Sequence, residues 1–169
     1  MTKLSLTLLA LILLSVTIAA QQPATSDDPL NWIVGKWEGT RYEPSSGDRA
    51  QLTSDITSVL DGVGQEEQIV ILRSGKKPYR GLYLQVFDPK IQKSVLMYIN
   101  ATRREFSRLE GTASTDRAEW LGTNTQGGHR SKLVCERLNA NEWRRTQYVS
   151  EDSGQTFSIL FVDTLKRRK

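Results

Sequence analysis

Residues 79–100, YRGLYLQVFDPKIQKSVLMYIN, contain two segments of alternating side chains separated by a turn. Along residues 79–87, aromatic residues fall on one side of an extended chain and aliphatic residues on the other: Tyr79, Tyr83 and Phe87 against Leu82, Leu84 and Val86. Asp88 and Pro89 begin the turn, and residues 94–100 (SVLMYIN) are apolar on both sides. Alternation with a period of two in segments this short predicts β-strands.

The same pattern continues along the chain on both sides of these two strands. We predict ten strands, over residues 36–42, 51–60, 65–72, 79–87, 94–100, 106–113, 117–123, 130–138, 142–151 and 156–165. Turn-forming residues separate them, including PSSG at 44–47, DG at 61–62, SG at 74–75 and NAN at 139–141. No amphipathic helical stretch interrupts the series, so consecutive strands are expected to pair as a meander.

A meander of this length leaves two long edges if the sheet stays open, and open edges invite aggregation. Closure into an up-and-down barrel removes both edges. We therefore predict an all-β fold, a single antiparallel up-and-down β-barrel of ten strands. A sandwich of two packed sheets is the alternative.

The first twenty residues, MTKLSLTLLALILLSVTIAA, have the layout of a secretory signal peptide: Lys3, an apolar run, then Ala19 and Ala20. The apolar run is shorter than the roughly 20 residues that cross a bilayer, so an uncleaved membrane anchor is the less favoured alternative. Cleavage near Ala19–Ala20 leaves a flexible polar leader, residues 21–27, and one domain, residues 28–169. We expect a secreted or periplasmic protein without a stable membrane span.

Net charge and cysteine content exclude few classes of binding partner. The formal net charge is +4, and much of the excess lies in the tail at residues 166–169 (KRRK). A solvated tail is favoured over a nucleic-acid site, because charges elsewhere are mixed and the chain looks exported. The single cysteine, Cys135, cannot form an internal disulfide, and a buried thiol is favoured over a reactive one.

A short helical turn is predicted at residues 28–35, directly before the first strand. Asp28 suits a helix N-cap, Pro29 suits the first helical position, and Gly35 suits the end of the turn. The residues between them, LNWIV, are too apolar for an exposed turn, so this segment is expected to close one end of the core.

The next residues, Gly35-Lys36-Trp37, resemble the opening signature of the lipocalin and wider calycin families. The resemblance implies that Trp37 lies at the closed end of a barrel. It also implies that a basic residue of the last strand, here Lys166 or Arg167, packs over the indole ring.

Three segments in order extend this likeness over nearly the whole chain: WEG at 37–39, GLYLQVFDP at 81–89 and EDSGQTF at 151–157. They are similar to a W-x-G first strand, a mid-chain segment ending in Asp-Pro, and a late S-x-D-G-G-x-T-W hairpin. This pattern belongs to a family of exported bacterial calycin-like proteins of unknown function. Phe157 stands where that pattern has Trp, and Ser153 where it has Gly. The resemblance implies a barrel and export, and it assigns no activity.

No catalytic or metal-binding constellation stands out. Glu66 and Glu67 are neighbours on one predicted strand, so they point to opposite faces and cannot act as a pair. No Gly-x-Ser-x-Gly motif precedes a helix. One histidine, His129, in a predicted loop and one cysteine cannot supply four zinc ligands. We therefore expect no catalytic residues, no metal and no cofactor.

Polar and aromatic residues on shared strand faces are the candidates for ligand binding. They are Trp37, Arg41, Tyr83, Gln85, Met97, Trp120, Arg145 and Gln147. If Arg41 and Arg145 point inward, they suit a ligand carboxylate above an apolar floor, since an unpaired buried charge is costly. Trp37, Met97 and Trp120 would form that floor. In the alternative, both arginines face solvent and the aromatic residues fill the core.

Three functions remain open at this point. The first is non-enzymatic binding of a small hydrophobic or amphipathic ligand inside the barrel. The second is a structural or interaction module of the cell envelope with a filled core, which a large exposed apolar patch would favour. The third is a cavity enzyme of the isomerase or hydratase type, which needs an inward titratable group. The candidates for that group are Glu38, Asp55, Glu66, Glu67 and Asp163.

Overall fold

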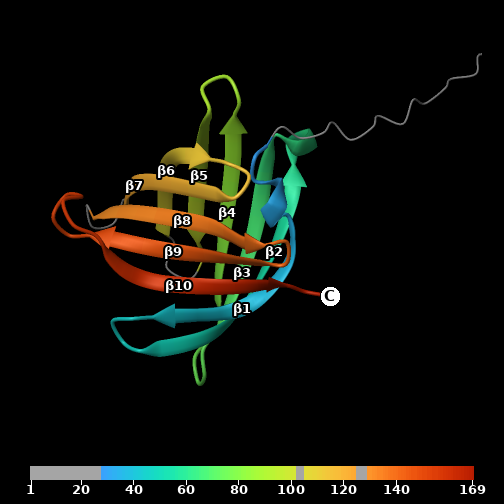
Figure 1. Cartoon of the computed structure of the whole chain (residues 1–169). Helices are drawn as coiled ribbons and strands as arrows, with labels where there is room; N and C mark the ends of the chain where they lie inside the picture. Colours follow the sequence, from blue (N-terminus) through green and yellow to red (C-terminus); the bar gives the residue numbers. More distant parts are fainter. Residues whose placement is uncertain (1–27, 102–104, 125–128) are drawn as a thin grey trace, which may run out of the picture.

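The computed structural model describes residues 28–101, 105–124 and 129–169, and these residues form a closed antiparallel barrel of ten strands (Figure 1). The predicted signal peptide and leader lie outside the described residues. The strands are β1 (Gly35–Glu43), β2 (Asp48–Val59), β3 (Gly64–Leu72), β4 (Tyr79–Asp88), β5 (Lys93–Asn100), β6 (Glu105–Ala113), β7 (Arg117–Asn124), β8 (Arg130–Asn139), β9 (Glu142–Ser150) and β10 (Ser158–Arg167). All ten predicted strands are present, with ends that differ by a few residues.

Closure comes from the pairing of the first strand with the last. β1 pairs with β2 on one side and with β10 on the other, from Trp37 opposite Arg167 to Tyr42 opposite Val162. Every other strand pairs with its neighbours in the chain, so no strand has a free edge. The barrel prediction is confirmed, and the two-sheet sandwich is excluded.

Two short 3₁₀ helices accompany the barrel, η1 (Asn31–Ile33) and η2 (Leu60–Gly62). The η1 segment lies within the predicted helical turn but begins at Asn31, with Leu30 and not Asp28 at its N-cap. The Asp28 carboxylate accepts a hydrogen bond from the Leu30 N–H at 2.9 Å, ahead of the helix. Leu30 and Ile33 are buried against the barrel core. No helix among the described residues is long and apolar enough to span a bilayer.

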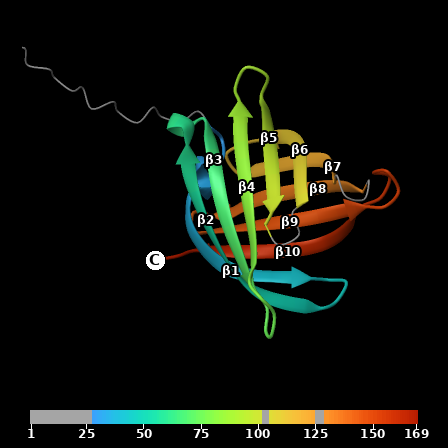
Figure 2. The same cartoon turned by 180° about the vertical axis from the view of Figure 1, so that it is seen from behind.

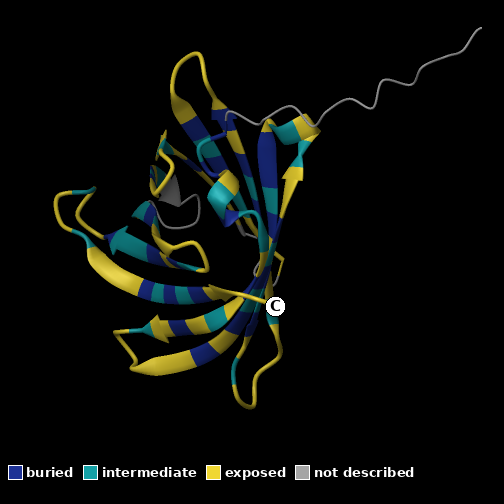
Figure 3. Cartoon of the chain, turned by 45° about the vertical axis from the view of Figure 1, so that its right-hand side comes forward, coloured by how far each residue is buried: buried dark blue, intermediate teal, exposed yellow. Residues whose placement is uncertain are grey.

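Buried residues alternate with more exposed ones along most of the strands (Figure 3), as an inner and an outer face require. At the end that η1 covers, the interior is filled by three tryptophans and aliphatic residues, among them Trp37, Trp120, Trp143, Leu52, Leu133 and Leu165. The Trp143 ring meets the Trp37 ring edge to face, with centroids 6.1 Å apart. This end of the barrel is closed by side chains.

A basic residue of the last strand does pack over Trp37. The Arg167 guanidinium carbon lies 4.2 Å from the centre of the Trp37 ring, and its Nη1 donates to the Val34 carbonyl at 3.1 Å. Of the two candidates, Arg167 fills this role because it lies directly opposite Trp37 and on the same side of β10 as the buried Leu165, whereas Lys166 points to the outer face. Arg167 therefore ties the end of the chain to the segment that covers the barrel.

Replacement of Arg167 by Ala should destabilise the closed end. The substitution removes a cation–π contact and hydrogen bonds to the Val34 and Trp32 carbonyls, so we expect a loss of about 1–2 kcal/mol in the free energy of unfolding. Urea denaturation followed by tryptophan fluorescence measures this loss. Lys166→Ala is the matched control and should leave stability nearly unchanged; equal effects would contradict the assigned role of Arg167.

Candidate functional site

The middle of the barrel holds four charged side chains that bind one another. Arg41 donates from Nε and Nη2 to the two carboxylate oxygens of Asp163, at 2.7 and 2.8 Å. Arg145 donates from Nε to Asp163 at 3.0 Å and from Nη1 to Glu67 at 2.7 Å. The Ser54 hydroxyl donates to the other oxygen of Glu67, also at 2.7 Å. We call Arg41, Asp163, Arg145 and Glu67 the charge layer.

Strand register brings these residues together across long stretches of sequence. Asp163 on β10 lies opposite Arg41 on β1 and opposite Arg145 on β9, and all three face inward. Glu67 reaches the same level from β3. The side chains of Arg145 and Asp163 are 1% and 0% exposed, so water does not screen these charges. Two cations and two anions give a neutral unit, which a buried site requires.

The charge layer also sets the protonation of its neighbours. Burial lowers the pKa of Arg41, but the Asp163 carboxylate outweighs this and raises it overall. The pKa of Arg145 is likewise raised despite burial, with Glu67 as the largest favourable contributor. Burial raises the pKa of the Cys135 thiol to about 12, and it raises the pKa of Tyr83 as well. Both arginines therefore stay charged, and neither Cys135 nor Tyr83 is ionised at neutral pH.

Above the charge layer, at the end of the barrel opposite η1, lies a pocket of about 270 Å³, which we call the mouth pocket. Its lining residues come from β1, β3, β4, β5 and β10 and from the chain just after β3. They are Arg41, Glu43, Ile69, Ile71, Arg73, Tyr79, Tyr83, Tyr98, Asn100, Leu160 and Phe161. The pocket thus has aromatic and aliphatic walls over a charged floor.

Ring contacts hold the walls of the mouth pocket in place. The Tyr83 and Tyr98 rings stack with centroids 4.5 Å apart, and the Arg41 guanidinium lies 3.5 Å from the centre of the Phe161 ring. At the rim, Arg73 and Glu43 form an ion pair. These contacts favour a preformed pocket, in which little side-chain ordering accompanies binding.

One guanidinium nitrogen in the floor remains available to a ligand. Nε and Nη2 of Arg41 are bound to Asp163, while Nη1 makes no hydrogen bond to any residue in the described part of the chain. The Tyr83 hydroxyl likewise has no protein partner among the described residues. The floor therefore offers hydrogen-bond donors, and its full positive charge is already neutralised by Asp163.

The structure brings only some of the predicted ligand-binding residues together. Arg41 and Tyr83 line the mouth pocket, and Arg145 lies below them in the charge layer. Trp37 and Trp120 belong to the closed end, where their indole N–H groups donate to the Ile33 carbonyl and to the Ser94 hydroxyl. They do not form the floor of a cavity.

The remaining three residues lie apart from the mouth pocket. Gln85 is buried on the inner face of β4, and Gln147 donates to the Tyr148 carbonyl at 3.1 Å. The placement of Met97 inside the barrel is wrong, because Met97 lies opposite Leu84 on the outer face. In a segment that is apolar on both sides, the sequence does not show which side turns inward.

The predicted partner of the two arginines also needs correction. They point inward, but Asp163 and Glu67 of the same chain bind them, so a ligand carboxylate is not needed to balance their charge. The alternative in which both arginines face solvent is wrong as well. The sequence shows that Glu66 and Glu67 point to opposite faces, but it does not show that Glu67 pairs with Arg145, 78 positions further along the chain.

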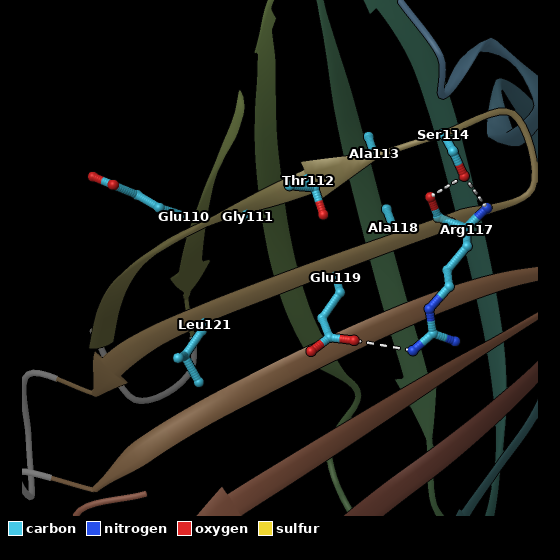
Figure 4. Close-up of a pocket in the computed structure, with 9 residues that line it drawn as sticks. All are labelled: Glu110, Gly111, Thr112, Ala113, Ser114, Arg117, Ala118, Glu119 and Leu121. Carbon is cyan, nitrogen blue, oxygen red and sulfur yellow. Dashed lines mark hydrogen bonds and ion pairs between the residues drawn. The ribbon is translucent and has the colours of Figure 1, made fainter. Parts of the chain in front are cut away.

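A second hollow, of about 470 Å³, lies on β6 and β7 and their connecting turn (Figure 4). Its lining mixes polar and apolar residues, and Arg117 is bound to Glu119 at 3.0 Å and to Glu136 at 2.6 Å. Because its charged groups satisfy one another and most of its lining is open to solvent, it is a weaker candidate than the mouth pocket. In the described ranges, no three His, Cys, Asp or Glu side chains gather as a metal site, and His129 is exposed just before β8.

Comparison with known proteins supports the fold and assigns no family. No family model and no curated protein matches the chain. Among solved structures, it is similar to the S-type phycobiliprotein lyase CPES from Guillardia theta, with 13% identity and a TM-score of 0.57, over 82% of this chain and 89% of that one. A redesigned beta barrel, b11L5F_LGL, and EF1p2_mFAP2b bound to DFHBI each give 11% identity and a TM-score of 0.47. They cover 82% and 83% of this chain, and 93% and 97% of those proteins. The chain thus shares its barrel fold with the lyase at a sequence identity of only 13%.

Removal of one cation from the charge layer should be strongly destabilising. Arg145→Met leaves Glu67 without a cation, and we expect a loss of about 3–5 kcal/mol in the free energy of unfolding. The double variant Arg145→Met/Glu67→Gln restores neutrality and keeps an acceptor for Ser54, so it should recover part of the loss. Urea denaturation of both variants measures the difference; a double variant no more stable than the single one would contradict the neutral-unit argument.

Proposed function

We propose that this protein is a non-enzymatic binding protein that takes one small amphipathic ligand into the mouth pocket. The observation that carries the proposal is a pocket with aromatic and aliphatic walls over a floor in which Arg41 Nη1 has no partner among the residues that the structure describes. Such a lining suits an apolar, preferably aromatic body with one hydrogen-bond acceptor directed at the floor. Aromatic and aliphatic side chains that form the walls, together with placed polar groups that fix the orientation of the ligand, are typical of small-molecule sites.

The size and depth of the pocket support a small ligand. About 270 Å³ is just below the range of roughly 300–1,000 Å³ for drug-sized ligand sites. The filled closed end and the charge layer prevent a long chain from reaching through the barrel. A compact ring system therefore fits better than an extended fatty acid.

The inward carboxylates do not favour the enzymatic alternative. Glu67 and Asp163 each accept hydrogen bonds from an arginine, and Glu67 accepts one from Ser54 as well. Both carboxylates are therefore engaged by partners of the same chain, and neither belongs to the lining of the mouth pocket. Tyr83, the titratable group between them and the pocket, remains protonated at neutral pH.

A fluorescent aromatic anion, 8-anilinonaphthalene-1-sulfonate, tests the mouth pocket. We expect saturable binding with a stoichiometry of one, and Tyr98→Ala should weaken it about tenfold because the wall ring is lost. Met97→Ala is the matched control: Met97 is the next residue on β5 but points outward, so its substitution should leave this affinity unchanged.

Two results would contradict the mouth pocket as the site. One is equal weakening by both substitutions, and the other is no saturable binding of this probe or of small aromatic carboxylates. Thermal unfolding of each variant shows whether lost binding reflects lost folding.

We also propose that the protein is exported and that residues 1–20 are removed. The charged start, apolar run and small residues at 19–20 support this proposal. Expression of the whole chain in a bacterial host should give periplasmic protein whose intact mass corresponds to a start near Gln21. Lys3→Glu weakens the charged start and should increase the fraction that keeps its N-terminus; a full-length, membrane-retained product would favour the anchor alternative.

A further inference from the structure

The outer face of β4 and β5 is apolar, whereas the outward residues of the other strands are largely polar. On β1, β2 and β9, for example, Lys36, Glu38, Gln51, Thr53, Asp55 and Arg144 point outward. On β4 and β5, three directly opposed pairs are all aliphatic or thioether: Leu82 and Ile99, Leu84 and Met97, and Val86 and Val95. These six residues, which we call the outer patch, account for the segment SVLMYIN being apolar on both sides.

The outer patch is accessible to a partner. Val86 and Ile99 are each 38% exposed, and the other four side chains are half-buried by their neighbours on the sheet. β3, β4, β5 and β6 are consecutive neighbours on one side of the barrel (Figure 2). The hairpin that joins β4 to β5 extends beyond the strands on either side of it. A contiguous apolar surface of this kind typically marks an interaction site.

Charged residues flank the outer patch on opposite sides. Glu66 on β3 lies opposite Leu84, and Arg108 on β6 lies opposite Met97, so one row across the sheet reads Glu66, Leu84, Met97, Arg108. Arg108 pairs with Glu110 on its own strand at 2.7 Å, and both side chains remain at least half exposed. An acid on one side and a base on the other make this face complementary to itself.

We propose that the outer patch binds a second copy of this chain in a twofold-symmetric dimer. If the twofold axis runs along the strands, β4 of one copy lies over β5 of the other, and β3 lies over β6. Leu84 then packs on Met97 of the second copy, and Glu66 faces Arg108 of the second copy. The symmetry repeats each contact, so the apolar rows provide affinity and the two ion pairs fix the register.

The charges around the outer patch argue against a lipid surface. The charges around it are of mixed sign: Glu66, Arg108 and Glu110 lie beside it, and Arg80, Asp88 and Lys93 lie at the ends of its two strands. An interfacial surface for anionic lipid carries clustered lysine or arginine instead. The mouth pocket opens at the end of the barrel, so the dimer leaves it accessible, and this inference does not depend on the proposed ligand.

Sedimentation velocity on protein purified after expression of the whole chain tests the dimer over a wide concentration range. We expect a reversible dimer, which Met97→Glu converts to monomer. Val162→Glu is the matched control, because Val162 is half-buried on the outer face of β10, away from the outer patch. Circular dichroism and thermal unfolding establish that each variant is folded.

A charge exchange tests the register. Glu66→Arg and Arg108→Glu should each weaken dimerisation about tenfold, because each places like charges opposite one another. The double variant restores opposite charges across the interface and should recover most of the affinity. A wild-type monomer at all concentrations, a Met97→Glu dimer as tight as wild type, or a double variant no tighter than the single ones would overturn the proposal. A monomer that floats with phosphatidylcholine–phosphatidylglycerol vesicles would overturn it in favour of a lipid partner.

Discussion

The ion pairs that Asp163 makes with Arg41 and Arg145 are the constraint on which the barrel interior depends. Each arginine is buried, and burial of either charge without its carboxylate partners would cost several kcal/mol in the free energy of folding, on the order of the penalty for an unpaired buried ion. The charge layer draws one member each from β1, β3, β9 and β10, so it links the two ends of the chain where the barrel closes. A one-residue slip of any of these strands would turn a charge outward and leave its partner buried alone. The layer therefore specifies the register of the closing strands in a way that interchangeable aliphatic residues do not.

The same layer divides the barrel into two chemically different halves. Between the charge layer and η1, tryptophan and aliphatic side chains fill the interior. Arg167 packs on Trp37 at that end. Above the charge layer, the mouth pocket rests on groups whose charges already cancel. A ligand there gains contact with aromatic walls without having to neutralise a buried cation. Selectivity then rests on shape and on one or two hydrogen-bond donors, which distinguishes this site from one built around an unpaired arginine.

Much of this fold was predictable from residues alone, because period-two alternation and turn residues are local signals. The ten strands, the closure and the contact of a last-strand base with Trp37 follow from such signals or from the resemblance that Gly35-Lys36-Trp37 carries. The interior site was only partly predictable. Arg41 and Tyr83 were identified, but Met97 was assigned to the wrong face, since Val95, Met97 and Ile99 are as apolar as the residues between them. Asp163 and Glu67 were not matched to their arginines, because cross-strand register depends on packing between distant segments.

The apolar outer face of β4 and β5 cannot be explained by the stability of the isolated barrel. Backbone hydrogen bonding is complete around the closed sheet, and the inner faces of these strands already supply Tyr79, Tyr83 and Tyr98 to the mouth pocket. Polar residues would serve as well on the outer side, as they do on β1 and β9, and would be less prone to aggregation. We interpret the three aliphatic rows, bounded by Glu66 and Arg108, as the contact surface of the proposed dimer. In that dimer the two copies pack through these rows and both mouth pockets stay open.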